Sequence, residues 1–223
     1  MIPWEQIDAG PIPGGEGELR LRRRGDEFAI VLGPVELMNS RKSGSERALA
    51  EIACARLAGR PRPRVLVGGL GMGFTLRAAL DALGPGARIV VAELVPAVAA
   101  WARGPLAHLF AGVLDDPRVV LHEADVAEIL RAGRGGYDAI LLDVDNGPDG
   151  LTRAANDRLY GPAGLGEARA ALRPGGLLAI WSQGPDRAFA ARLGRAGFAV
   201  EEVRPRAHGG GGRRHVVWIA TRS

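Results

Sequence analysis

The chain has 223 residues, 47% of them hydrophobic and 24% charged, so we expect one substantial core in a soluble domain. No stretch approaches the roughly eighteen apolar residues of a transmembrane helix, and no signal-peptide pattern is visible. A cytoplasmic protein without a membrane partner is expected. Net charge is only +4 and Lys42 is the single lysine. The arginine-rich composition therefore indicates a GC-rich, bacterial genome, and no nucleic-acid partner is predicted.

The first part of the chain predicts a small β appendage over residues 1–42, ahead of a main domain over 43–223. Residues 1–17 lack periodicity and are expected to be an irregular lead-in. Short strand patterns follow at 18–24, 27–32 and 35–38. Gly25-Asp26 gives the first two a hairpin signal. The basic run Arg20–Arg24 alternates with Leu21, which is typical of a solvated strand face.

The main domain alternates helices with short apolar strands, the pattern of an α/β fold with a parallel sheet. The expected strands are 64–68, 87–92, 118–122, 137–142, 177–182, 198–204 and 214–220. The expected helices are 74–83, 95–103, 126–132, 164–172 and 186–196, with one more beginning at Ser43. No helix joins the last two strands, so they form a hairpin with an antiparallel strand. This predicts a Rossmann-like, seven-stranded, mostly parallel sheet with a terminal antiparallel hairpin.

Three smaller features have structural interpretations. Ser43 and Glu46 fit a capping box at the start of the first helix. The lone cysteine, Cys54, lies among apolar residues and is expected in the core. The histidines lack metal-ligand spacing, so no metal site is predicted; they are His108, His122, His208 and His215.

A glycine turn between the strand at 64–68 and the following helix indicates a nucleotide-like ligand. Gly69, Gly71 and Gly73 alternate along it, and glycine permits positive φ and close approach of the backbone. The dinucleotide fingerprint would require a third glycine at position 74, which is Phe74. The spacing instead resembles the first motif of class I S-adenosylmethionine (AdoMet)-dependent methyltransferases.

Acidic residues follow the next three strands, at the sheet edge where doubly wound folds bind ligands. A carboxylate at Glu93 could accept hydrogen bonds from ribose hydroxyls. Asp125 could accept from an adenine amino group, or equally cap the helix that it precedes. Asp143 ends the fourth strand, nearest the expected reacting centre, where a carboxylate favours cations or accepts a proton.

Together these motifs resemble the spermidine synthase-like branch of the class I AdoMet-dependent methyltransferase superfamily. The resemblance covers roughly residues 18–221 and rests on Gly69-Leu70-Gly71-Met72-Gly73, Glu93, Ala124-Asp125, Tyr137–Asp143 and Leu172–Gly176. It implies that AdoMet, or its decarboxylated form, is held by Gly69, Leu70, Gly71, Gly73, Glu93, Leu94, Ala124, Asp125 and Asp143. Relatives of the family are often dimers, so a homodimer is also implied.

The chain departs from that family at three places. Met72 stands where the family has an aspartate that helps to bind the aminopropyl amine. Asp143-Val144-Asp145 is shorter than the family's Asp-Ser-Ser/Thr-Asp-Pro run. A Tyr-His-Glu gate is reduced to Gly44-Ser45-Glu46. Because a free methionine carboxylate conflicts less with Met72 than with an aspartate, the sequence slightly favours ordinary AdoMet and methyl transfer.

The resulting hypothesis is a transferase that alkylates a small, amine-bearing acceptor. Asp143 is the predicted catalytic residue, and Asp145, Glu46 and Gln183 are the predicted substrate contacts. One alternative is an aminopropyltransferase that makes a polyamine. Another is a non-catalytic nucleotide-binding or scaffold protein. A nucleic-acid methyltransferase is disfavoured, because no aromatic ring follows Asp143 to stack a flipped base.

Overall fold

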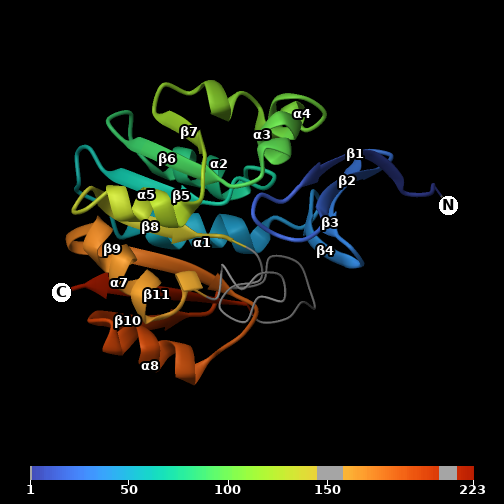
Figure 1. Ribbon diagram of the computed structural model, residues 1–223. Helices are drawn as coiled ribbons and strands as arrows, with labels where there is room; N and C mark the ends of the chain where they lie inside the picture. Colours follow the sequence, from blue (N-terminus) through green and yellow to red (C-terminus); the bar gives the residue numbers. More distant parts are fainter. Residues whose placement is uncertain (1, 145–157, 206–214) are drawn as a thin grey trace.

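The computed structural model describes residues 2–144, 158–205 and 215–223, which form two β-sheets with helices around the larger one (Figure 1). The larger sheet has seven strands in the order β10-β11-β9-β8-β5-β6-β7. These are β5 (Arg64–Gly68), β6 (Arg88–Glu93), β7 (Val119–Glu123), β8 (Tyr137–Leu142), β9 (Leu172–Ser182), β10 (Phe198–Val203) and β11 (Val216–Arg222). Strand β11 pairs antiparallel with both neighbours, and the other pairs are parallel. The predicted fold class, including the terminal hairpin, is confirmed.

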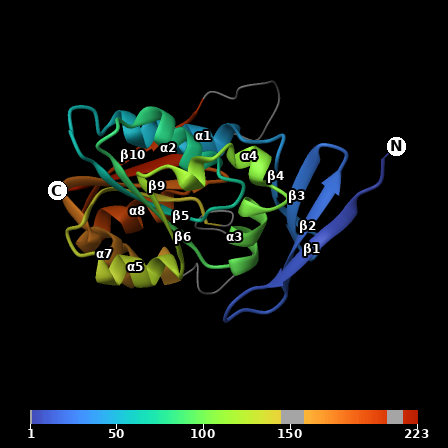
Figure 2. The same cartoon turned by 90° about the horizontal axis from the view of Figure 1, so that it is seen from above.

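Helices cover both faces of this sheet, as the view from above shows (Figure 2). They are α1 (Gly44–Ala55), α2 (Phe74–Ala82), α3 (Pro96–Arg103), α4 (Ala107–Phe110), α5 (Val126–Ala132), α7 (Pro162–Ala171) and α8 (Arg187–Arg195), with a 3-10 turn η1 (Val113–Asp115). Side chains alternate along each strand, so β8 sends Leu141 into the core with α1–α4 and Leu142 into the core with α5, α7 and α8. Burial on both faces explains the nearly continuous apolar runs of the central strands.

The smaller sheet is an antiparallel meander at the N-terminus. It consists of β1 (Glu5–Pro11), β2 (Glu18–Arg24), β3 (Glu27–Leu32) and β4 (Val35–Asn39), paired in chain order. The expected irregular lead-in over residues 1–17 is therefore wrong where β1 forms. That strand is at the sheet edge and mostly exposed, so its sequence carries no hydrophobic alternation. The division of the chain into domains at residues 42 and 43 stays a prediction.

Two contacts join β1 to helix α3 of the main fold. The Asp8 carboxylate accepts a hydrogen bond of 2.7 Å from the indole N–H of Trp101. This bond, with one from the Ala9 N–H, holds the pKa of Asp8 below its usual value. At Gly10 the backbone lies against Ala97 so closely that an added Cβ would be 2.2 Å from the Ala97 Cβ. The small sheet is thus fixed to the main fold at β1.

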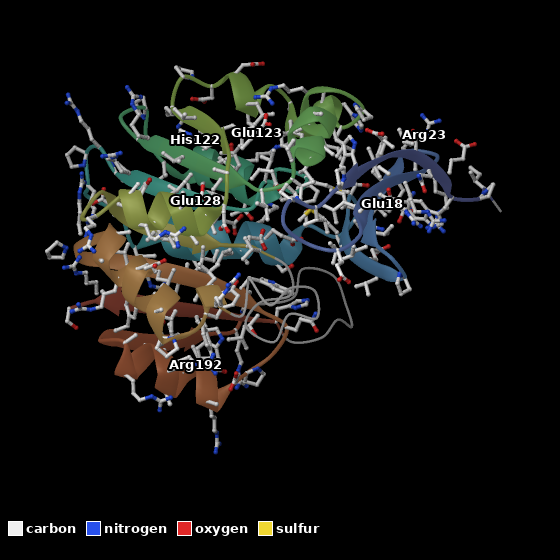
Figure 3. All side chains as sticks on the ribbon, viewed as in Figure 1. Glu18, Arg23, His122, Glu123, Glu128 and Arg192 are labelled. Carbon is white, nitrogen blue, oxygen red and sulfur yellow. The ribbon has the colours of Figure 1, made fainter. Side chains whose placement is uncertain are left out.

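The basic run on β2 behaves as a solvated strand face. Leu21 points into the core with no exposed surface, whereas Arg20 and Arg23 are exposed. Arg20 forms an ion pair with Glu18, and Arg23 with Glu5. Figure 3 shows Glu18 and Arg23 on the outer part of this sheet, away from α5 and α8. Neighbouring carboxylates therefore balance these cations locally.

Several local predictions can be compared with the structure. Cys54 is buried, and this raises the pKa of its thiol to about 12. Ser43 occupies the N-cap position of α1 but makes no side-chain capping bond, so the predicted capping box is wrong. Residues 173–176, between the expected helix at 164–172 and the expected strand at 177–182, are part of β9 and lie beside a register shift between Tyr137 and Ala139 of β8.

Among the described residues, no helix is long and apolar enough to cross a membrane. No group of three or more acidic, histidine or cysteine side chains is placed to hold a metal ion in that same part of the chain. His122 lies on the exposed edge strand β7 (Figure 3). His208 and the glycine tetrad 209–212 lie outside the described residues.

Candidate active site

A cavity of about 490 Å³ lies where the carboxyl ends of the parallel strands meet the N-terminal sheet. This is the edge at which doubly wound folds place ligands. The predicted site residues that line it are Glu46, Gly69, Gly71, Glu93, Leu94, Ala124, Asp125, Asp143 and Gln183. Leu70 and Gly73 belong to the same turn but do not line the cavity. Asp145 lies outside the described residues.

The glycine turn is held tightly by its neighbours. Gly69, Gly71 and Gly73 have φ values of 92°, 52° and 77°, in the left-handed region that favours glycine. A Cβ at Gly69 would lie 2.6 Å from the backbone carbonyl oxygen of Asp143, and one at Gly73 would lie 2.5 Å from the Phe110 ring. The alternating glycines are therefore required both by conformation and by close packing.

Glu93 ends β6 and fixes the glycine turn from one side. One carboxylate oxygen accepts a 2.9 Å bond from the Leu70 N–H, and the other a 2.8 Å bond from the Val95 N–H. The residue is only 8% exposed. Burial raises the pKa of this carboxyl, and the surrounding backbone N–H groups partly oppose that rise. Glu93 thus joins the glycine turn to the segment that begins α3, and both border the cavity.

Asp125 follows β7 and has the capping role considered from sequence. It is the N-cap of α5, and its Oδ1 accepts a 2.8 Å bond from the Ala127 N–H. It also lines the cavity together with Ala124. The cap uses one oxygen, so the other can still meet a polar group of a ligand.

Asp143 directly follows β8 and is held from two directions. Its backbone N–H donates to the Gly68 carbonyl at 3.0 Å. Its Oδ2 accepts a 2.6 Å bond from the hydroxyl of Thr75, which is 4% exposed. Burial and, after it, the nearby Glu46 carboxylate raise the pKa of Asp143, and the Thr75 bond partly opposes this rise. The resulting pKa is about 7. A carboxyl with that pKa can exchange a proton near neutrality.

Glu46 faces the cavity from the first turn of α1. Its Oε2 accepts a 2.6 Å bond from the Ser45 hydroxyl, instead of returning to the Ser43 backbone as a capping box requires. It lines the cavity with Asp143. Two carboxylates therefore face the same space, and the repulsion between them favours a bound cation.

Met72 does not reach the cavity, although its position motivated the preference for ordinary AdoMet. Its side chain has no exposed surface and packs in the core with α1–α4. Its backbone N–H instead donates to the thioether sulfur of Met38 at 3.0 Å. Met38 belongs to β4 and lines the cavity. The side chain at position 72 therefore does not contact a ligand bound in the cavity.

The N-terminal sheet supplies one wall of the cavity. Its apolar part comes from Ile12, Leu19, Ile30, Leu32 and Leu37. Its polar part contains Glu36, which accepts a 3.2 Å bond from Lys42, and Asn39. Lys42 carries the one ammonium among the described lining residues, and Glu36 already pairs with it.

The wall beyond Asp143 comes from β9 and β11. Gln183 lies one residue after β9, as predicted for a substrate contact. The Trp181 and His215 rings lie 5.0 Å apart at a 34° tilt, and both line the cavity. The Trp181 indole N–H has no hydrogen-bond partner among the described residues. An aromatic wall beside carboxylates suits an alkyl ammonium ligand.

Two residues in or beside the cavity were missed by sequence reasoning. Thr75 carried a weak signal, because a hydroxyl in the first turn after the glycine turn must lie near the strand ends. Met38 carried none, because its place in the cavity depends on how the two sheets meet.

The residues present fit an adenosyl group. Glu93 and Asp125 lie on neighbouring strand ends, where ribose hydroxyls and a base amine would need acceptors. The apolar wall from the N-terminal sheet can cover a ring and a thioether. Glu46 and Asp143 line the same cavity, and the Thr75 hydroxyl donates to Asp143.

No family model matches the chain. Several curated proteins do match it, among them two polyamine aminopropyltransferases. It is 34% identical over 150 residues to polyamine aminopropyltransferase 1 of Streptomyces coelicolor, covering 64% of this chain and 27% of that protein. It is 33% identical over 173 residues to polyamine aminopropyltransferase of Mycobacterium tuberculosis, covering 75% of this chain and 31% of the relative. The chain thus spans less than a third of the length of these relatives.

Solved structures show the same fold. The spermidine synthase of Thermotoga maritima superposes with a TM-score of 0.75 at 18% identity, over 98% of this chain and 73% of that one. A spermidine synthase in complex with the transition state analogue AdoDATO gives 0.73 at 18% identity, over 98% and 72%. Human methyltransferase-like protein 13 in complex with SAH gives 0.62 at 22% identity, over 80% and 82%. The expected resemblance to the spermidine synthase-like branch of the class I fold is confirmed.

Proposed function

We propose that the chain transfers an aminopropyl group from decarboxylated AdoMet to a small amine, and so makes a polyamine. The observation that carries this proposal is the pair of carboxylates, Asp143 and Glu46, facing one cavity beside the glycine turn. Such a pair favours ligands that carry ammonium groups and no free carboxylate. The aminopropyltransferase names of the curated relatives support the same reaction.

The donor's adenosine is proposed to lie between the strand ends and the N-terminal sheet. Glu93 would accept the ribose hydroxyls, with Leu94 beside them, and Asp125 would accept the base amine. The aminopropyl tail would lie along the glycine turn and lead toward Asp143. This places the sulfonium near Asp143, where the reaction must occur.

In the proposed reaction the amine nitrogen of the acceptor attacks the propyl carbon bound to sulfur. A carbon–nitrogen bond forms and the carbon–sulfur bond breaks, with its electron pair passing to sulfur and releasing methylthioadenosine. The amine must lose one proton, which Asp143 accepts. Glu46 and Gln183 are proposed to orient the acceptor, and alignment supplies much of the rate. Asp145 remains a proposed acceptor contact.

Ordinary AdoMet suits this cavity less well than the sequence suggested. The preference for it assumed that Met72 lines the donor site, and Met72 is buried in the core. The carboxylate of a methionine tail would instead lie near Asp143 and Glu46, which bear the same charge. Methyl transfer is therefore the second candidate function. A methyltransferase-like protein shares this fold.

The experiment is a product assay with purified protein. Decarboxylated AdoMet and AdoMet are each incubated with linear diamines and triamines, and methylthioadenosine and S-adenosylhomocysteine are quantified by mass spectrometry. We expect methylthioadenosine and an aminopropylated amine from the decarboxylated donor. S-adenosylhomocysteine and a methylated amine would instead establish methyl transfer. Binding of adenosyl ligands with no product from either donor would favour the non-catalytic reading.

A further inference from the structure

Met38 of β4 lies against the glycine turn, beside Gly71 and the Met72 N–H. The Met72 N–H donates to its sulfur at 3.0 Å. A Cβ built on Gly71 would lie 2.7 Å from the Met38 methyl carbon and 2.8 Å from its sulfur. Gly71 and Met38 both line the cavity. The N-terminal sheet thus places one apolar side chain directly on the turn.

The bond to sulfur uses a backbone donor that an anion could otherwise engage. The Gly69 and Gly73 N–H groups donate to the Ala92 and Leu70 carbonyls, and the Leu70 N–H donates to Glu93. The Met72 N–H, two residues before α2, donates to the sulfur instead, and the start of a helix favours negative charge. A thioether is only a weak acceptor, whereas a carboxylate would accept this N–H strongly. While Met38 remains in place, the Met72 N–H is covered and the space beside Gly71 is filled.

We propose that Met38 is a donor-specificity residue, which favours decarboxylated AdoMet by denying the carboxylate of ordinary AdoMet the Met72 N–H. The inference rests on the proposed function, since it concerns the donor of that reaction. It assigns the discrimination to a side chain of the N-terminal sheet rather than to side chain 72 of the turn.

The surrounding charges act in the same direction. A carboxylate that cannot reach the Met72 N–H would remain near the carboxyl groups of Glu46 and Asp143, and the ammonium of Lys42 lies at 3.2 Å from Glu36. Specificity here comes from leaving the unwanted charge unpaired, which is more effective than a small loss of contact area. The ammonium of the decarboxylated tail has no such conflict.

The test measures dissociation constants by calorimetry for three probes: AdoMet, decarboxylated AdoMet and methylthioadenosine, which has no amino-bearing tail. Met38→Ala opens the space and frees the N–H. We expect it to lower the ratio of the AdoMet constant to the decarboxylated AdoMet constant by about tenfold or more, the size of a hydrogen bond to a charged group. Met38→Leu keeps the volume and removes the sulfur, so its ratio should stay close to that of the unmodified chain.

Methylthioadenosine is the control for folding and for the nucleoside part of the site, and its affinity should be the same in all three proteins. An unchanged ratio in Met38→Ala, with normal methylthioadenosine binding, would overturn the inference and leave the proposed function intact. A ratio that falls equally in Met38→Leu would also overturn it, because the filled volume would then not matter. If the unmodified chain binds none of the three probes, the proposed function fails as well.

Discussion

The hydroxyl of Thr75 donates a 2.6 Å hydrogen bond to Oδ2 of Asp143, and it joins the start of α2 to the end of β8. This bond fixes the carboxylate and lowers its pKa against the opposing effect of burial. Thr75→Val keeps the shape and removes the donor. We expect turnover at neutral pH to fall by about tenfold or more, while donor affinity changes little. Single-turnover kinetics would measure the first and calorimetry the second.

Thr75→Ser is the matched control for this change, because it retains a hydroxyl at the same position. It should restore most of the rate. The midpoint of the pH–rate profile should also move upward in Thr75→Val, since a stabilising bond to the ionised form is lost. A purely structural role for Thr75 would lower stability without moving that midpoint, and would contradict the positioning role.

The rate of the unmodified chain should rise with pH through about 7. Asp143 accepts a proton only when ionised, and burial followed by the nearby Glu46 raises its pKa to about that value. Asp143→Asn should lower turnover by about a hundredfold or more and leave donor binding largely unchanged. A flat pH–rate profile between pH 6 and pH 8 would remove Asp143 from the proton transfer.

The same substitution has a consequence for stability. The folded-state pKa of Asp143 lies above its ordinary value of 3.8, so ionisation at higher pH destabilises the folded chain. Above pH 7, Asp143→Asn should therefore unfold at the same temperature as the unmodified chain or higher. A lower unfolding temperature at pH 8 by calorimetry would show that the carboxylate has a structural role that asparagine cannot supply.

Glu46→Gln should move the pH–rate profile in the opposite direction to Thr75→Val. Removing the nearby negative charge lowers the pKa of Asp143, because one of the causes that raise it disappears. The rate should then reach its plateau at a lower pH, while the Michaelis constant for a cationic acceptor rises. An unchanged midpoint would indicate that the two carboxylates do not interact in the working protein.

Asp138 gives a prediction about stability away from the cavity. It is 3% exposed at the start of β8 and accepts hydrogen bonds from the Arg64 N–H, Arg60 and Arg173. Burial opposes its charged form, yet these bonds outweigh it and hold the pKa below the usual value. Asp138→Ala should cost about 2 kcal/mol or more of unfolding free energy in urea.

The loss of stability at acid pH tests whether the pKa of Asp138 is lowered in the folded chain. Because the folded-state pKa of Asp138 is depressed, its contribution is present above the unfolded pKa near 4 and is lost as the pH falls further. The unmodified chain should therefore lose stability below about pH 4 more steeply than Asp138→Ala. Parallel acid transitions in the two proteins would contradict this.

The main sheet could be predicted because its signals are local. The apolar run of β5, the alternating glycines and the short runs that follow each depend on a few adjacent residues. The antiparallel strand at the end of the sheet could be predicted because the sequence carries no helical pattern between the last two strand patterns. The acids at 93, 125 and 143 could be brought together because parallel strands end at one edge.

The rest depended on tertiary contacts. Strand β1 has no apolar alternation, and its order comes from pairing with β2 and from the Asp8–Trp101 bond. The direction of side chain 72 could not be read from the glycine spacing, so Met72 was placed beside the ligand although it lies in the core. Met38 reaches the turn from 34 residues earlier in the chain.

The close approach of Gly69 to the Asp143 carbonyl limits which residues of the site can change during evolution. Since a side chain at 69 would displace the backbone of residue 143, the turn that receives the donor and the residue proposed to take the proton form one mechanical unit. Position 72 is outside that unit, because its side chain points into the core. A lineage could therefore exchange residue 72 freely within the limits of packing, and yet be constrained at 69 for as long as the reaction is retained.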